Sequence, residues 1–411
     1  MNLRLLLIAC LLFLLPATIV ARVVTGSERT PLYLPLLEGK RVALMSNHTG
    51  ITGSIHTLDH LIENGVDVTT IFSPEHGFRG TASAGEHVGS SVDPETGIPI
   101  ASLYDGKTRT PSQATMDSFD VLVVDIQDVG TRFYTYYITM LDLMNASARH
   151  GKQVVIFDRP NPNGMTVDGP ILRPEYHSGV GRLPIPVMHG MTLGELAQMI
   201  VGEGWLDNAA TLDLTVIPCE GYTHSTRYEL PVPPSPNLPD MTAIYLYPSL
   251  CYFEATDVSI GRGTDRPFTI YGHPLMKGPY SFTPHNKPGA VNPPCRDRLC
   301  HGYDLSSLPH DSIIAAGINL EYLLRAYCQL KGRTSDASSK SGKASTGPFL
   351  TKFFEKLIGS PEVRRQIAAS GLNASSTDKD IADVARSISR SWQGEVESFR
   401  RQRAPYLLYA E

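Results

Sequence analysis

The chain has 411 residues, of which 42% are hydrophobic and 19% are charged, with 35 glycines and 31 prolines. A chain of this length typically forms two domains, and this composition excludes a disordered, coiled-coil or collagen-like protein. Because 36 basic and 41 acidic residues give a formal charge of -5, no strong positive field attracts phosphate polymers, and nucleic acid is not expected as a partner.

The first predicted element is a secretory signal peptide over residues 1–21. An apolar, Leu-rich stretch from Leu3 to Ala21 surrounds the single charge of Arg4 and ends in a small residue, as in a cleaved signal. Cys10 has only a few apolar residues before it, so a lipoprotein anchor is the less favoured alternative. We therefore expect a secreted or periplasmic protein without a stable membrane span after signal removal.

Apolar and helical segments alternate after the signal. Short apolar runs predict strands at 41–46, 68–72, 100–103, 121–126, 154–157 and 212–217. Helical spacing predicts helices at 57–64, 134–149 and 193–201. Because the strands are continuously apolar and are joined by helices, the predicted fold class is α/β, with a parallel sheet covered by helices on both faces.

The pattern changes at the Pro-rich passage VPPSPNLPD (232–240), after which strands and helices alternate less regularly. We place a domain junction there, between an N-terminal domain over 22–235 and a smaller α+β domain over 236–411. In the second domain, helical spacing predicts helices at 312–330 and 349–369.

Five cysteines remain once residues 1–21 are removed, an odd number in a chain large enough to fold without covalent staples. A disulfide framework is therefore not expected to organise the fold. Cys295 and Cys300 lie in a Pro-rich loop and could pair with each other or with a third cysteine. Neither they nor any CxxC pattern forms a zinc site, so no metal is predicted.

Polar side chains follow several of the predicted strands. The carboxyl ends of parallel strands meet at one edge of a sheet, where ligands bind in open α/β folds. In chain order, these side chains are Asn47 and His48, Glu75 and His76, Asp125 and Asp128, and Asp158, Arg159 and Asn161. Their coincidence after four strands predicts an active site at that edge.

Glu75 is the strongest catalytic candidate. Pro74 and Gly77 constrain the turn around it, and His76 could tune its proton affinity, while the structural alternative is a helix-capping carboxylate. Glu86 lies on the same long connection, and loops of that length are usually functional. Two carboxylates in unequal surroundings are the groups that cleave glycosidic bonds.

Asp125, Asp128, Arg132 and Tyr134 share one segment at the end of the fourth strand. The two aspartates could act on a substrate or could accept hydrogen bonds from backbone amides at the strand end. Arg132 and Tyr134 could orient a carboxylated substrate, and the structural alternative for Arg132 is an ion pair with Asp128.

Asp158 and Arg159 precede a rigid PNPN turn that would aim polar side chains at a ligand, or they form an ion pair within the turn. His189 is a further candidate, just before a helix start. There Thr192 and Glu195 fit a capping box, so Glu195 is read as a helix signal and not as a catalyst.

In the second domain, a Gly-Arg-Gly-Thr turn brings its backbone and the guanidinium of Arg262 close to any anionic group. The turn is neither a Walker loop nor a dinucleotide-binding fingerprint, because the required glycine spacing after a strand is missing. A nicotinamide cofactor is therefore disfavoured, and no cofactor is predicted.

A series of motifs runs along nearly the whole chain after the signal. They are SNHTG (46–50), SPEHGFRG (73–80), AGE (84–86), TGIP (96–99), SLYDG (102–106), DVLVVDIQDVGTRFYTY (120–136), FDRPNPNG (157–164), DGP (168–170), HGMTLGELA (189–197), VPPSPNLP (232–239), GRGTDRPF (261–268) and YLLY (406–409). Together they closely resemble the NamZ-type exo-β-N-acetylmuramidases, a bacterial family long catalogued as a domain of unknown function.

The resemblance implies a secreted glycoside hydrolase that removes terminal N-acetylmuramic acid (MurNAc) from the non-reducing end of peptidoglycan fragments. It also implies a Rossmann-like N-terminal domain that faces a smaller C-terminal domain across a cleft. The family's motif residues fall on Glu75, Glu86, Asp125, Asp128, Arg132, Tyr134 and Arg262.

From these motifs we expect Glu75 to act as the general acid on the β-1,4 bond after MurNAc, with Glu86 or Asp125 as base or nucleophile. The lactyl carboxylate of MurNAc would lie against Arg262 or Arg132. The other expected substrate contacts are Asn47, His48, His76, Asp128, Tyr134, Asp158, Arg159, Asn161 and His189.

Two other functions also fit the residues. A metal-dependent hydrolase would use His48, His76, Asp125 and Asp128 as ligands, and chelation with EDTA would abolish its activity. A sugar-binding or muropeptide-binding protein without turnover would leave a MurNAc–GlcNAc disaccharide intact.

Overall fold

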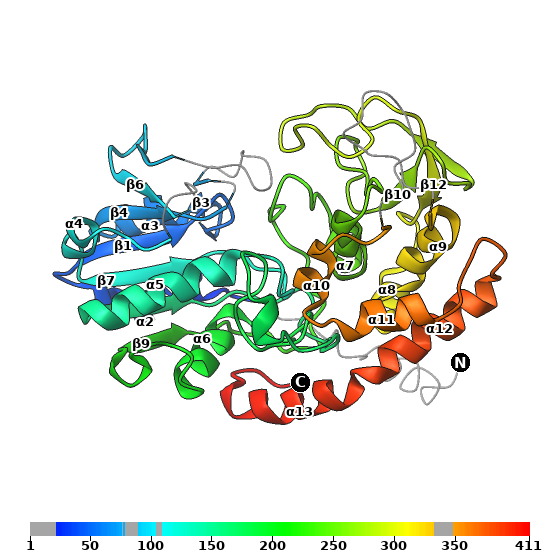
Figure 1. The fold of residues 1–411 in the computed structure, drawn as a ribbon. Coiled ribbons are helices and arrows are strands. Elements are labelled where there is room, and N and C mark those ends of the chain that lie inside the picture. The colour runs from blue at the N-terminus through cyan, green and yellow to red at the C-terminus, as the bar shows by residue number, and fades with distance from the viewer. Residues whose placement is uncertain (1–21, 76, 79–88, 104–108, 333–347) are drawn as a thin grey trace, which may run out of the picture.

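The computed structural model describes residues 22–75, 77–78, 89–103, 109–332 and 348–411. These residues form two lobes (Figure 1). The first lobe, up to residue 240, is built around a large sheet, and the second lobe begins at the following helix. The carboxyl ends of the large sheet's parallel strands face the second lobe, which places the predicted ligand edge between the two (Figure 1).

The large sheet has seven strands among the described residues. In spatial order they are β5 (Ser91–Val92), β6 (Pro99–Ser102), β4 (Asp67–Ser73), β1 (Arg41–Ser46), β7 (Val121–Asp125), β8 (Gln153–Phe157) and β9 (Leu214–Ile217). All neighbours are parallel except the short edge pair of β5 with β6. When the six parallel strands are numbered along the chain, their spatial order across the sheet is 3-2-1-4-5-6, the Rossmann order. The α/β prediction is therefore confirmed.

Alternate residues of the strands point to opposite faces, and helices bury both. Val42 and Leu44 pack in one cluster with Tyr33 of α2 (Thr30–Leu37) and Leu58 of α3 (Thr57–Glu63). The opposite face of the sheet packs against α4 (Gln113–Asp117), α5 (Tyr136–His150) and α6 (Leu193–Gly202). This double burial is the reason that the strands are continuously apolar.

The second lobe combines a small sheet with helices. Its antiparallel strands lie in the order β10 (Ile270–His273), β12 (Cys300–Asp304), β11 (Tyr280–Phe282). Its helices are α7 (Met241–Leu250), α8 (His310–Ala316), α9 (Glu321–Leu330), α10 (Phe353–Ile358), α11 (Glu362–Ala369), α12 (Asp378–Ser391) and α13 (Gln393–Arg403). The remaining short elements are the hairpin β2 (Ile51–Thr52) and β3 (Ile55–His56) and the 3-10 helices η1 (Gly26–Glu28), η2 (Pro174–Tyr176), η3 (Ala209–Thr211), η4 (Cys251–Ala255) and η5 (Ala404–Tyr406).

Two helices predicted as continuous are each broken at a glycine. The segment 312–330 divides between α8 and α9 at Gly317, and the segment 349–369 divides between α10 and α11 at Gly359. Both glycines have positive φ, +57° and +84°, which an α-helix does not accommodate. At Gly359 a side chain would also meet Nη2 of Arg132 at 2.5 Å, so the break permits a close approach between the lobes.

The end of the chain returns to the first lobe, and α13 runs back beneath it (Figure 1). The hydroxyl of Tyr409 donates to Oδ2 of Asp158 at 2.6 Å, and the amide of Leu408 donates to Oε1 of Glu195 at 2.8 Å. Both acceptors are fully buried. The last residues therefore complete the hydrogen bonding inside the first lobe.

Candidate active site

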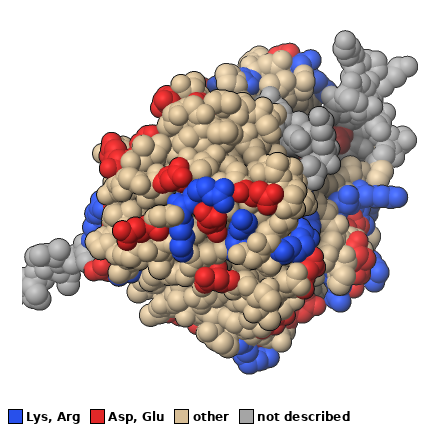
Figure 2. Space-filling model, turned by 90° about the vertical axis from the view of Figure 1, so that its left-hand side faces the viewer, with Lys and Arg blue, Asp and Glu red and all other residues tan. Residues whose placement is uncertain are grey.

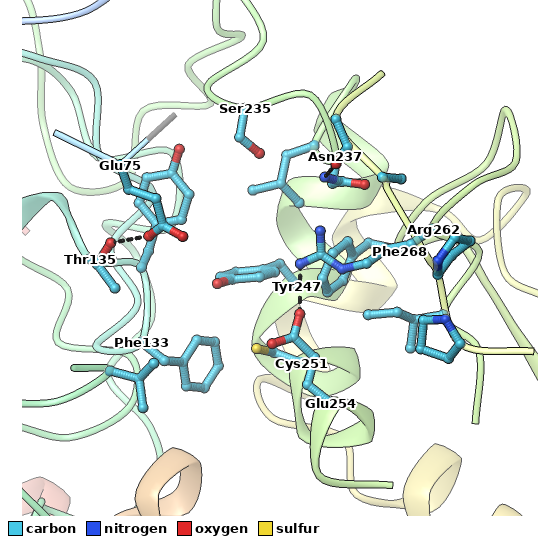
Figure 3. A pocket seen from close by; sticks show the side chains of 18 of the residues that line it. Glu75, Phe133, Thr135, Ser235, Asn237, Tyr247, Cys251, Glu254, Arg262 and Phe268 are labelled. Atoms are coloured by element: carbon cyan, nitrogen blue, oxygen red, sulfur yellow. Dashed lines mark hydrogen bonds and ion pairs between the residues drawn. The ribbon is translucent and has the colours of Figure 1, made fainter. Parts of the chain in front are cut away.

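A cavity of about 440 Å³ lies between the lobes, a size suited to one sugar residue and its substituents. The first lobe contributes Glu75, from the turn after β4, residues 133–135, from the loop between β7 and α5, and Tyr136, the first residue of α5. The second lobe contributes residues of α7, η4 and the Gly-Arg-Gly-Thr turn. Both the edge of the parallel sheet and the second domain thus form its walls, as Figure 3 shows.

Glu75 occupies the first-lobe wall of the cavity. Its side chain is half-buried, and the hydroxyl of Thr135 donates to its Oε2 at 2.5 Å. The turn that presents it closes through a hydrogen bond from the amide of Gly77 to the carbonyl of Pro74, with Gly77 at φ +76°. The constrained turn expected around Glu75 is present, and it directs the carboxyl into the cavity (Figure 3).

Arg262 occupies the opposite wall, where it pairs with Glu254 of η4 (Figure 3). Nη2 of Arg262 lies 2.6 Å from Oε1 of Glu254, and the guanidinium lies over the ring of Phe268, 5.0 Å from its centroid. Burial acts to lower the pKa of Arg262, but the charge and hydrogen bond of Glu254 outweigh it and raise the pKa above its ordinary value. The cavity therefore contains a fixed cation.

Aromatic side chains line the cavity between these two walls. Phe133 and Tyr247 meet edge to face, with ring centroids 5.2 Å apart, and Tyr247 meets Phe268 at 5.0 Å. The hydroxyls of Tyr134 and Tyr136 both donate to the carbonyl of Pro234, at 2.8 and 3.1 Å. Burial raises the pKa of these tyrosines, so they stay neutral hydrogen-bonding groups beside an apolar surface.

Asp125 does not belong to this cavity. It is fully buried and forms a two-pronged ion pair with Arg159, Nε to Oδ1 at 2.6 Å and Nη2 to Oδ2 at 2.9 Å. The hydroxyl of Thr57 also donates to its Oδ2, at 2.5 Å. Asp125 was predicted as a base or nucleophile and Arg159 as a substrate contact, but in the structure their charges neutralise each other inside the protein and neither residue lines the cavity.

Arg132 is also buried away from the cavity. Its Nη1 donates to the carbonyls of Pro170 and Ile185, at 2.9 and 2.7 Å, and its Nη2 donates to the carbonyl of Leu357 at 2.9 Å. Burial lowers the pKa of Arg132 to about 10. Although Arg132 was predicted to clamp a substrate carboxylate, in the structure its side chain connects loops of the first lobe to α10 and does not line the cavity.

Three more predicted contacts are structural. Asp158 accepts hydrogen bonds from the amide of Gly194 and the hydroxyl of Thr192 at the start of α6, and burial raises its pKa to about 6. Asn161 donates to the carbonyl of Met191 at 2.9 Å. His189 is 1% exposed, and burial lowers its pKa to about 3, so it is neutral. The capping box at the start of α6 is confirmed.

The residues after β1 and β7 lie behind the cavity wall. Nδ2 of Asn47 donates to the hydroxyl of Tyr136 at 2.9 Å, so Asn47 supports a cavity residue. Nε2 of His48 lies 2.9 Å from the carbonyl oxygen of Pro233. Asp128 is 7% exposed, its Oδ1 accepts from the amide of Gly130 at 2.7 Å, and burial raises its pKa to about 7. None of these side chains lines the cavity among the described residues.

Two predicted site residues, His76 and Glu86, lie outside the described residues. Within the described ranges, no group of three or more His, Cys, Asp or Glu side chains is placed to hold a metal ion. Cys295 and Cys300 pack in one small cluster as free thiols.

The structure adds residues that sequence reasoning missed as site members, namely Thr135 and Glu254. Glu254 comes from a 3-10 helix that continues α7, and the only sequence signal for it was an acid eight residues before Arg262. Thr135 was hidden inside the motif of Arg132 and Tyr134.

Comparison with known families identifies the family of this chain. The model of the N-terminal domain of the exo-β-N-acetylmuramidase NamZ matches residues 42–242, and the model of its C-terminal domain matches residues 245–409. This chain belongs to the NamZ family. The two models meet at the beginning of α7.

Individual relatives agree with the NamZ assignment. The peptidoglycan β-N-acetylmuramidase NamZ of Bacillus subtilis (strain 168) is 36% identical over 94% of this chain and 92% of its own length. A crystal structure of a DUF1343 family protein from Bacteroides fragilis superposes with a TM-score of 0.82 at 50% identity, over 95% of this chain and all of that chain. A second DUF1343 structure from the same organism gives 0.74 at 28% identity, over 94% and 99%.

Proposed function

We propose that this protein is an exo-acting β-N-acetylmuramidase, a glycosidase that releases terminal MurNAc from the non-reducing end of peptidoglycan fragments such as MurNAc–GlcNAc. Membership of the NamZ family supports the reaction. The observation that carries the residue roles is the placement of Glu75 and Arg262 on opposite walls of one sugar-sized cavity. The test is product analysis of a MurNAc–GlcNAc digest, in which free MurNAc must appear.

Glu75 is proposed as the general acid. Hydrolysis of a glycosidic bond needs a proton donor at the leaving oxygen and a second carboxylate that acts as base or nucleophile. Glu75 reaches the cavity and is half-buried, which suits proton transfer to a bound sugar. Glu86 and Asp125 were the two predicted candidates for this second carboxylate, and Asp125 forms a buried ion pair with Arg159. This leaves Glu86, from the AGE motif, as the proposed second carboxylate.

Arg262 is proposed to bind the lactyl carboxylate, the group that distinguishes MurNAc from N-acetylglucosamine. A guanidinium offers five N–H donors in a planar fork, and one bond to Glu254 leaves donors for a second carboxylate. Arg132, the other predicted clamp, donates to three backbone carbonyls instead. Tyr247 and Phe268, beside Arg262, give the apolar surface against which a sugar packs.

The Arg262→Met variant is expected to raise KM for MurNAc–GlcNAc by roughly 10–100-fold, because it loses a charge-assisted hydrogen bond to the substrate. Steady-state kinetics on MurNAc and GlcNAc aryl glycosides should show that the preference for MurNAc falls by a similar factor. The double variant with Glu254→Gln is the control, since it removes the unpaired acid that the single change leaves behind. An unchanged preference for MurNAc in both variants would show that Arg262 does not bind the lactyl group.

We also propose that the protein is exported, with residues 1–21 removed as a signal peptide. The apolar composition of this segment supports the proposal. In the part of the chain that the structure describes, no helix has the length and apolar character needed to cross a membrane. N-terminal sequencing of the mature protein tests the proposal, and an intact Met1 on the exported protein would contradict it.

A further inference from the structure

Thr135 stands at the N-cap of α5, a helix of 15 residues, but does not cap it with its side chain. Threonine at this position normally accepts a hydrogen bond from a backbone amide of the first helical turn. Here its hydroxyl instead donates to Oε2 of Glu75 at 2.5 Å (Figure 3). The residue at the start of α5 is therefore of a helix-capping type, but its hydroxyl binds a side chain of the cavity wall instead of the helix backbone.

The backbone around Thr135 is held from both sides. The side chains of its neighbours Tyr134 and Tyr136 converge on the carbonyl of Pro234, and Asn47 donates to the hydroxyl of Tyr136. Both tyrosines are at most 6% exposed. The Thr135 hydroxyl therefore has a fixed position beside Glu75, and its hydrogen bond can orient the half-buried carboxyl.

The hydrogen bond also distinguishes the two oxygens of Glu75. Because Oε2 accepts from Thr135, a proton on the carboxyl belongs on Oε1, which points away from Thr135 toward the space between the two walls (Figure 3). When that proton leaves, Glu75 becomes a carboxylate, and a hydrogen bond to a charged acceptor is stronger than one to a neutral acid. The bond from Thr135 therefore strengthens as the reaction proceeds.

We propose that Thr135 is a positioning residue for Glu75 in glycosidic bond cleavage, an inference that rests on the function proposed above. In this step the bond between C1 of MurNAc and the leaving oxygen breaks, and its electron pair stays on that oxygen. Oε1 of Glu75 delivers its proton there, which releases GlcNAc with a free hydroxyl at the former linkage. Water supplies the hydroxyl that ends on C1. Its other proton replaces the one that Glu75 gave up, so the net reaction is hydrolysis.

The test compares Thr135→Val, which removes the hydroxyl at nearly constant volume, with Thr135→Ser, which keeps it. Each is assayed on MurNAc–GlcNAc, whose leaving group needs a proton, and on 2,4-dinitrophenyl β-MurNAc, whose leaving group does not. For the valine variant we expect kcat on the disaccharide to fall ~10-fold or more, with KM within about twofold. On the dinitrophenyl substrate kcat should stay within about threefold, and serine should restore the disaccharide rate.

Three results would overturn the positioning role: an equal loss of kcat on both substrates, an unchanged disaccharide rate in the valine variant, or no rescue by serine. Thermal unfolding accompanies the kinetics, and Thr135→Ala replaces the valine variant if that one does not fold. The failure of the proposed function is a separate result, because wild-type protein would then release no MurNAc from either substrate.

Discussion

The Glu75→Gln variant is expected to hydrolyse MurNAc–GlcNAc at least ~100-fold more slowly than the wild type, with little change in KM. Glutamine has nearly the same shape, and its amide oxygen can still accept the hydrogen bond from Thr135. It cannot give a proton to the leaving oxygen, so the loss falls on the chemical step. Chromatographic measurement of free MurNAc under saturating substrate gives kcat directly.

The dinitrophenyl glycoside of MurNAc is the control for Glu75→Gln. Its leaving group departs without protonation, so the variant should retain most of the wild-type rate of cleavage on this substrate. This control separates a missing acid from a damaged cavity. Turnover of the disaccharide close to the wild-type value would remove Glu75 from the mechanism.

The second large effect concerns stability. Arg159→Met is expected to lower the free energy of unfolding by about 3–5 kcal/mol, because it leaves the Asp125 carboxylate buried without its counter-charge. The side chains of the pair are 3% and 0% exposed, so water cannot replace the guanidinium. Urea unfolding followed by circular dichroism measures the loss, and the double variant with Asp125→Asn should recover part of it.

A surface ion pair supplies the matched control for Arg159. Arg149 and Asp207 are separated by 3.4 Å, but their side chains are 41% and 73% exposed. Arg149→Met should therefore change the free energy of unfolding by less than ~1 kcal/mol. Equal effects of the two arginine substitutions would contradict the structural role given to the Asp125–Arg159 pair.

The central strands of the large sheet were predictable because burial on both faces requires a continuous run of apolar residues, whereas the short strands β2, β3 and β5 were not predicted. All five residues of β7 are buried, and a continuous apolar run is the only pattern that satisfies both helical layers. The sequence, with 36 basic and 41 acidic residues, also predicted a surface without a strong positive field. On the face shown in Figure 2, basic side chains lie beside acidic ones. The two helix breaks were missed because a glycine in a helical pattern gives no sign of its φ.

The site was predicted less well, because position at a strand end does not determine what a side chain meets. Asp125 ends β7 and Arg159 follows the neighbouring strand β8 by two residues, so they are well placed to bind a ligand and equally well placed to bind each other. Glu75 lies at the corresponding position after β4, and its side chain lines the cavity. Only coordinates can distinguish these outcomes, since the partners are 34 residues apart.

The return of the chain's end to the first lobe has a consequence for the order of folding. Asp158 and Glu195 are buried in the first lobe, yet each accepts a hydrogen bond from residues 408–409. Until residues 408–409 have been synthesised and have packed against the first lobe, these two carboxylates lack these donors. The Rossmann-like half therefore completes its internal hydrogen bonding only with a segment that is synthesised after the second lobe.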